Sequence, residues 1–105
     1  MTAVTSHVFG IRQFDRDARF LSIKSPEFDF DSFDIIAESL LLAIDARVVE
    51  KESNADLHIW LIDFEGCRLL LKGEHYSGAL WLESMSDDDE ETLTFIASLL
   101  NSSRW

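Results

Sequence analysis

The stretch that decides the fold is residues 57–84, LHIWLIDFEGCRLLLKGEHYSGALWLES. Residues 57–64 are rich in Ile, Trp and Phe, which predicts a strand. Glu65-Gly66 predicts a two-residue hairpin turn, after which residues 67–74 return as a second strand. The turn residues HYSG (75–78) predict a four-residue loop before a third strand over residues 79–84. Strands joined by such short turns must be antiparallel.

This register sorts the side chains onto two faces, because alternate residues of a strand point to opposite sides. If Glu65-Gly66 is the turn, Phe64 pairs with Cys67 and His58 pairs with Gly73. The first face then carries His58, Trp60, Ile62, Phe64, Cys67, Leu69, Leu71, Leu80 and Leu82. The second carries Leu57, Ile59, Leu61, Asp63, Arg68, Leu70, Lys72, Glu74, Ala79, Trp81 and Glu83. We expect helices to cover the first face, which is almost wholly apolar.

The second face is more apolar than the solvated side of an antiparallel sheet usually is, so we expect it to be covered. The N-terminal segment could cover it with Val8, Phe9, Ile11 and Phe14. A second copy of the chain or a different protein could also do so. Trp81, beside Ile59 and Lys72 and flanked by charge, is the residue that we most expect at such an interface.

Outward from this stretch, apolar spacing predicts a helix over residues 33–46 and a second helix over 86–101. Strands are expected over 19–24 and 47–52, and residues 1–17 are left irregular apart from a weak strand over 7–14. The predicted order is β-α-β-β-β-β-α. The fold class is α+β: a two-layer sandwich in which two helices cover one face of an antiparallel meander, within a single domain of residues 1–105.

Two acidic stretches have both a structural and a functional interpretation. In SMSDDDEETL (84–93), Ser86 and Asp89 match a capping box, and carboxylates favour the first turn of a helix. In EFDFDSFD (27–34), Asp31 or Ser32 would cap the first helix while the Phe side chains enter the core. Alternatively, both stretches bind a basic partner. The candidate partner-binding residues are therefore Trp81, Ile59, Lys72, Asp87, Asp88, Asp89, Glu90, Glu91, Asp29 and Asp31.

The sequence offers little for catalysis or for a cofactor. It contains no HExxH, no paired Cys-x-x-Cys, no phosphate-binding glycine loop and no G-x-S-x-G. The hairpin register places Cys67 roughly 20 Å from His58 at the rise of a strand, which is too far for a nucleophilic pair. A metal site at His58, Glu74 and His75 has only weak support, and DDDEETLTFIAS lacks the alternation and the Gly of a calcium loop. We therefore predict no catalytic residue, no metal and no cofactor.

Composition limits the class of protein. The chain has 105 residues, 47% of them hydrophobic, so it can bury a core, and its net charge of −11 disfavours both nucleic acid and anionic membranes as partners. Its one cysteine fits a reducing compartment, hence the cytoplasm. The first 20 residues include five charged side chains and lack the apolar region of a secretory signal.

Residues 60–84 also carry a resemblance to a known family. The Asp-Phe-Glu-Gly hairpin, followed by Glu-x-x-Ser-Gly-x-x-Trp-Leu-Glu, resembles a family of small uncharacterised gamma-proteobacterial proteins of about this length. The resemblance covers about a quarter of the chain. It implies a single bacterial domain and no assigned activity or site residue.

Three functions remain open on these observations. The first is a non-enzymatic acidic module that docks on a basic protein, in the manner of an immunity protein or a secretion chaperone. The second is a small-ligand binder or enzyme that uses a cleft between sheet and helices. The third is an accessory subunit whose mixed sheet face is buried in an obligate assembly.

Overall fold

Three strands joined by two short turns form the centre of the computed structural model, as the alternation of residues 57–84 predicts. They are β4 (Leu57–Phe64), β5 (Cys67–Glu74) and β6 (Ala79–Ser84). The predicted pairing of Phe64 with Cys67 and of His58 with Gly73 is confirmed, as is the four-residue loop that separates β5 from β6. Glu65 and Gly66 both have positive φ, 52° and 88°, as a two-residue hairpin turn of type I′ requires.

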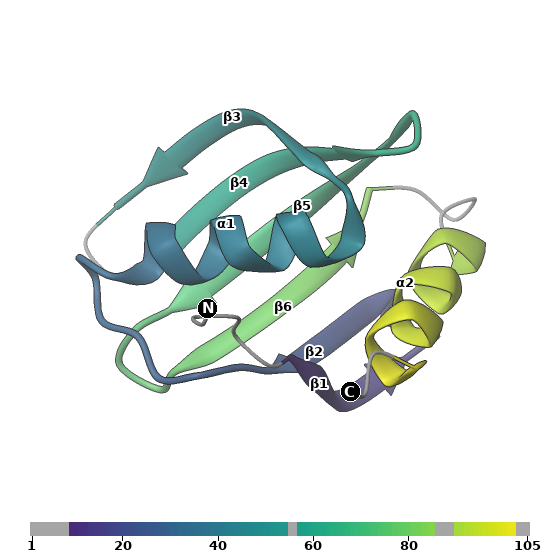
Figure 1. Ribbon diagram of the computed structural model, residues 1–105, viewed down its shortest axis with the longest axis horizontal. Coiled ribbons are helices and arrows are strands. Elements are labelled where there is room, and N and C mark those ends of the chain that lie inside the picture. The colour runs from purple at the N-terminus through teal and green to yellow at the C-terminus, as the bar shows by residue number, and fades with distance from the viewer. Residues whose placement is uncertain (1–8, 55–56, 86–89, 103–105) are drawn as a thin grey trace, which may run out of the picture.

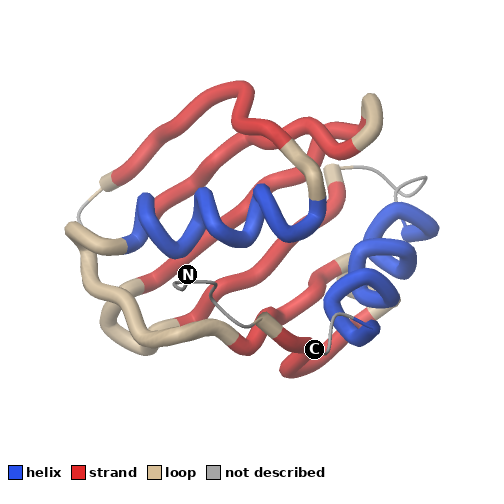
Figure 2. The backbone as a smooth tube through the Cα atoms, in the orientation of Figure 1, coloured by secondary structure: helices blue, strands red, loops and turns tan. Residues whose placement is uncertain are grey.

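The complete sheet has six antiparallel strands in the order β1-β2-β6-β5-β4-β3 (Figure 1). Its edges are β1 (Gly10–Asp15) and β3 (Arg47–Ser53), and β2 (Phe20–Lys24) pairs with β6. The helices α1 (Phe33–Ile44) and α2 (Glu90–Ser102) both lie against one face of this sheet (Figure 2). The structure describes residues 9–54, 57–85 and 90–102, and the predicted α+β sandwich is confirmed.

Helix α1 forms because apolar residues recur at helical spacing. Ser32 is its N-cap residue, but the Ser32 side chain makes no capping hydrogen bond to the helix. Ser32 and Asp29 bond reciprocally: the Ser32 N–H donates to Oδ1 of Asp29 over 2.8 Å, and the Asp29 N–H donates to Oγ of Ser32 over 2.9 Å. The helix ends two residues earlier than predicted, because Asp45 takes a left-handed conformation with φ of 60°.

The first strand, β1, is the element that the sequence shows least clearly. A bulge between Ile11 and Gln13 places Ile11 and Phe14 on the same face of the sheet, although they are three residues apart. The alternation of a regular strand is thereby lost. This bulge explains why residues 10–15 show only a weak strand pattern and why most of the N-terminal region was expected to be irregular.

The core lies between the helices and the face of the sheet that they cover. It contains the apolar residues that the hairpin register assigns to that face, together with the buried stripes of both helices. Phe28 and Phe33 join it, whereas Phe30 does not and is 40% exposed. Neither described helix is long and apolar enough to cross a membrane. The predicted start of the second helix at Ser86 lies outside the described residues.

Candidate functional site

The face of the sheet opposite the helices carries the strongest candidate for a binding site. The outer sheet face is defined here by the half-buried side chains of Phe20, Leu57, Ile59, Leu61, Leu70, Lys72, Trp81 and Glu83. Both described helices lie on the other side of the sheet, so no described element covers these residues (Figure 2). The result is a broad surface in which apolar side chains surround Lys72 and Glu83, and a largely apolar surface of this kind is typical of protein interaction sites.

The strand register brings three of the predicted site residues together at the centre of this face. Ile59 pairs with Lys72, and Lys72 pairs with Trp81, so the three side chains form one row across β4, β5 and β6. The neighbouring row contains Leu61, Leu70, Glu83 and Phe20. Residues that are 22 positions apart in the chain, Ile59 and Trp81, therefore share one surface.

The charged groups at the centre of the outer sheet face bond to one another. Nζ of Lys72 lies 3.1 Å from Oε1 of Glu83, and the indole N–H of Trp81 donates to the other carboxylate oxygen over 2.8 Å. The ring of Phe20 lies beside that of Trp81, with centroids 5.9 Å apart. A partner that covers this face would bury charges that are already paired, which costs less than burying isolated ones.

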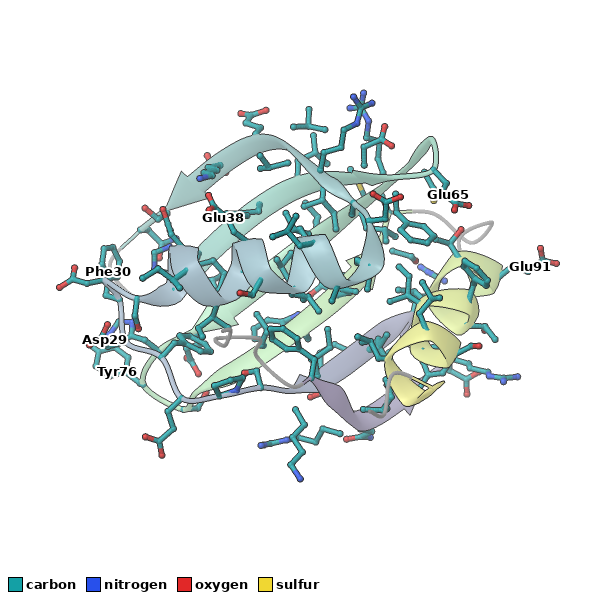
Figure 3. All side chains as sticks on the ribbon, in the orientation of Figure 1. Asp29, Phe30, Glu38, Glu65, Tyr76 and Glu91 are labelled. Carbon is teal, nitrogen blue, oxygen red and sulfur yellow. The ribbon has the colours of Figure 1, made fainter. Side chains whose placement is uncertain are left out.

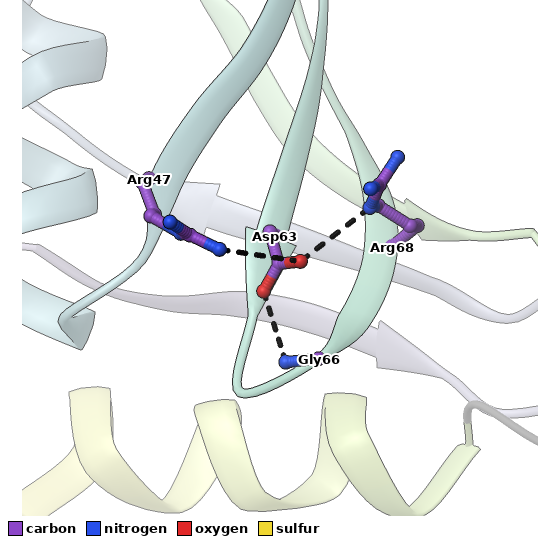
Figure 4. Close-up of polar contacts among 4 residues, drawn as sticks. All are labelled: Arg47, Asp63, Gly66 and Arg68. Atoms are coloured by element: carbon purple, nitrogen blue, oxygen red, sulfur yellow. Dashed lines mark hydrogen bonds and ion pairs between the residues drawn. The ribbon is translucent and has the colours of Figure 1, made fainter.

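A second set of paired charges closes the end of this face at the β4–β5 hairpin (Figure 4). Oδ2 of Asp63 lies 3.4 Å from Nε of Arg68 and 3.9 Å from a guanidinium nitrogen of Arg47. Its Oδ1 accepts a hydrogen bond from the Gly66 N–H over 2.9 Å. That hydrogen bond, together with the two arginines, lowers the pKa of Asp63 below its usual 3.8, although partial burial opposes the shift.

The predicted acidic site residues lie elsewhere. Asp29 and Asp31 are exposed in the loop before α1, and Glu91 is exposed on α2; Figure 3 shows Asp29 and Glu91 at opposite ends of the molecule. Asp29 also has a structural role, since its hydrogen bonds with Ser32 lower its pKa and fix the start of α1. Asp87, Asp88 and Asp89 lie outside the described residues, as does the side chain of Glu90.

The described part of the N-terminal segment does not cover the outer sheet face. Phe9 is buried in the core, and Ile11 and Phe14 pack against that core from the side that faces the helices. Of the three possible covers of the second face, these three residues are therefore excluded. The bulge in β1 is the reason, because it turns both Ile11 and Phe14 inward. Val8 lies outside the described residues.

Sequence reasoning missed the surroundings of His58. The side chain is 5% exposed and stacks on Phe33, with ring centroids 4.3 Å apart and planes nearly parallel. Burial lowers the pKa of His58; Asp34 and the Phe30 carbonyl oppose this shift and His75 adds to it. No group of three or more His, Cys, Asp or Glu side chains within the described residues is arranged to hold a metal ion.

Comparison with known proteins gives a family and no activity. A family model described as a protein of unknown function, DUF3630, matches residues 9–101. This span includes every described strand and all but the last residue of α2. No curated protein and no solved structure matches the chain.

Proposed function

The chain belongs to the DUF3630 family of proteins of unknown function, and from its own surface we propose that it is a non-enzymatic interaction module whose outer sheet face docks on a basic protein. The observation that carries the proposal is the largely apolar surface of that face, which no described element covers. Trp81, Ile59 and Leu70 would be its anchoring residues. A few residues near the centre of an interface supply most of its binding energy, and Trp is enriched among them, so Trp81 is the main anchor.

The charge of the chain favours a basic partner over a second copy. Each copy carries a net charge of −11, so two copies repel each other at moderate ionic strength. Beside the outer sheet face, Glu50 and Glu52 are exposed on β3, whereas Arg47 and Arg68 are paired with Asp63. A partner with an apolar centre and a basic rim would complement this arrangement. The chain would then act as an immunity protein does toward a basic toxin, or as a chaperone does toward its client.

An obligate assembly is the second candidate function, and the same face supports it. If a partner chain buried the outer sheet face permanently, the interface would resemble a hydrophobic core shared by two chains. The two candidates differ in the behaviour of the isolated chain. A docking module stays monomeric and soluble when purified, whereas an obligate subunit dimerises or aggregates. Sedimentation of the purified chain at low and high salt separates them.

The docking proposal is tested with a matched pair of neutral substitutions. Ile59 lies at the centre of the outer sheet face, and Ile35 is 62% exposed on α1. Ile59→Gln would bury an unsatisfied amide in the complex, a cost of roughly 1–3 kcal/mol that corresponds to about a fivefold or greater loss of affinity. Ile35→Gln makes the same chemical change on the other side of the molecule.

In this experiment each tagged variant is expressed in its native cells and its bound proteins are quantified after washing at low and at high salt. We expect one basic protein with the wild type and with Ile35→Gln, weakened by salt and depleted with Ile59→Gln. Equal recovery with both variants would contradict a role for this face. Circular dichroism of both variants confirms that the fold is intact.

A further inference from the structure

A cavity of about 330 Å³ lies on the helix side of the molecule, between the start of α1 and the edge strand β3. It is lined by Phe30, Asp31, Asp34, Lys51, Glu52, Ser53, His58 and Trp60. Figure 3 shows Phe30 at the end of α1 where the helix begins and Glu38 further along, toward β3. The volume is at the lower end of the range for small-molecule sites.

The polar groups of this cavity are mostly hydrogen-bond acceptors. Asp31 in the pre-helix loop and Asp34 in α1 line the cavity and bring two carboxylates to it. His58 is more than nine-tenths buried, and its Nε2 has no hydrogen-bond partner. Because burial lowers the pKa of His58, the imidazole is neutral near pH 7, and Nε2 can accept a hydrogen bond. This set of groups complements a cation that carries several N–H donors.

An ammonium group of the chain itself already occupies part of the site. Nζ of Lys51 lies 4.3 Å from the centroid of the Trp60 ring, 3.3 Å from a carboxylate oxygen of Glu38 and 3.9 Å from one of Asp34. An aromatic face with flanking carboxylates is the arrangement that binds alkylammonium ions. The side chains of Lys51, Asp34 and Glu38 are 42%, 56% and 60% exposed, so these ion pairs are weak and exchange readily.

We propose that this cavity binds the alkylammonium group of an external ligand, and that Lys51 is a built-in competitor that the ligand displaces. The ligand's ammonium would take the place of Nζ over Trp60, between Asp34 and Glu38. The rest of the ligand would extend toward Asp31 and Nε2 of His58. This site is separate from the outer sheet face and does not depend on the docking proposal.

The first test removes the competitor. Butylammonium is titrated into the full chain while NMR chemical shifts are followed at the Trp60 indole and the His58 ring. Lys51→Ala should bind butylammonium at least roughly threefold more tightly than the wild type, because Nζ of Lys51 no longer occupies the site. Lys24→Ala, the same loss of one exposed charge on β2, should leave the affinity unchanged. If neither the wild type nor Lys51→Ala shows shifts at these two residues, the proposal is overturned.

The second test separates a specific site from general attraction to an acidic protein. Asp34 lines the cavity, whereas Asp45 is exposed just beyond the other end of α1. Asp34→Asn should weaken butylammonium binding by roughly threefold to fivefold, the range of a partly exposed charge pair. Asp45→Asn removes the same charge and should have little effect. An equal loss in both variants would overturn the proposal.

Two alkylammonium probes distinguish a free small amine from a lysine side chain of a protein as the natural ligand. One is 1,4-diaminobutane, which represents a free small amine, and the other is a blocked lysine amide, which represents a protein side chain. Tighter binding of the diamine assigns the site to small amines, and tighter binding of the lysine amide assigns it to a partner's lysine. If both probes fail to shift the cavity resonances in Lys51→Ala, the site does not bind ammonium groups.

Discussion

Gly73 in β5 lies so close to the ring of Phe33 that no side chain fits between them. A Cβ at position 73 would overlap that ring, and Phe33 is fully buried and cannot move aside. Gly73→Ala should therefore lower the free energy of unfolding by roughly 1–3 kcal/mol, as overpacking does. Urea denaturation measures this change. Gly10→Ala is the control, because its Cβ would meet nothing closer than Cβ of Lys24 at 3.9 Å. Equal stability of the two variants would contradict the close packing.

His58 predicts a pH dependence of stability with a definite sign. Burial lowers its pKa below the usual 6.5, so the unfolded chain binds a proton that the folded chain does not. The stability that the neutral His58 ring contributes is complete above about pH 6.5, and it is lost as the pH falls through the lowered pKa of the folded chain. We expect His58→Phe to reduce the loss of unfolding free energy between pH 6.5 and 5. Denaturation curves at several pH values measure this. If the unfolding free energy of His58→Phe fell with pH as steeply as that of the wild type, the assignment would be contradicted.

Single residues show where sequence reasoning stops. A glycine within a strand pattern indicates a close approach, but only the structure identifies Phe33 as the neighbour. The alternation places His58 on the inner face correctly, yet the stacking on Phe33 depends on where α1 begins. Lys51 looks like an ordinary residue of an edge strand. Its position over Trp60 results from pairing with β4, which no local pattern contains.

The β4–β5 hairpin depends on Asp63 for its turn and for its charge pairing. Oδ1 accepts the Gly66 N–H, and Oδ2 lies near Arg47 and Arg68. Asp63→Ala should lower the urea midpoint more than Asp63→Asn, because an amide oxygen can still accept the turn hydrogen bond. The difference between wild type and Asp63→Asn should shrink as the pH falls from about 3.8, where the unfolded chain takes up the proton, through the lowered pKa of Asp63 in the folded chain. Identical midpoints for the two variants at neutral pH would show that the turn hydrogen bond contributes nothing.

At the scale of elements, the hairpins were predictable and the first strand was not. Strands β4, β5 and β6 follow a regular alternation with short turns, so their register follows from local sequence. Strand β1 pairs with its neighbour in the sequence, β2, but it contains a bulge that hides its alternation. The same bulge decides which way Ile11 and Phe14 point. It therefore determines that the described N-terminal residues do not cover the outer sheet face.

At the scale of the whole molecule, the sequence predicts which face of the sheet is apolar without being covered by the helices, but it identifies no partner for that face. The apolar rows of the outer sheet face follow from the hairpin register. Of the acidic residues predicted to bind a partner, those that the structure describes lie in the pre-helix loop and on α2, away from the row of Ile59, Lys72 and Trp81. These acidic residues and the apolar rows therefore lie on different surfaces, whereas the sequence alone suggested one set of partner-binding residues. A net charge of −11 still favours a basic partner through long-range attraction.

Site-specific photo-crosslinking in native cells tests the central proposal most directly. A photoreactive amino acid is placed at position 59, in the outer sheet face, or at position 35, on the exposed side of α1. We predict a single basic protein crosslinked from position 59 and not from position 35, with a yield that falls when Trp81 is replaced by Ala. Crosslinks from position 35 alone, or none from either position in cells that contain the folded chain, would contradict docking through the outer sheet face.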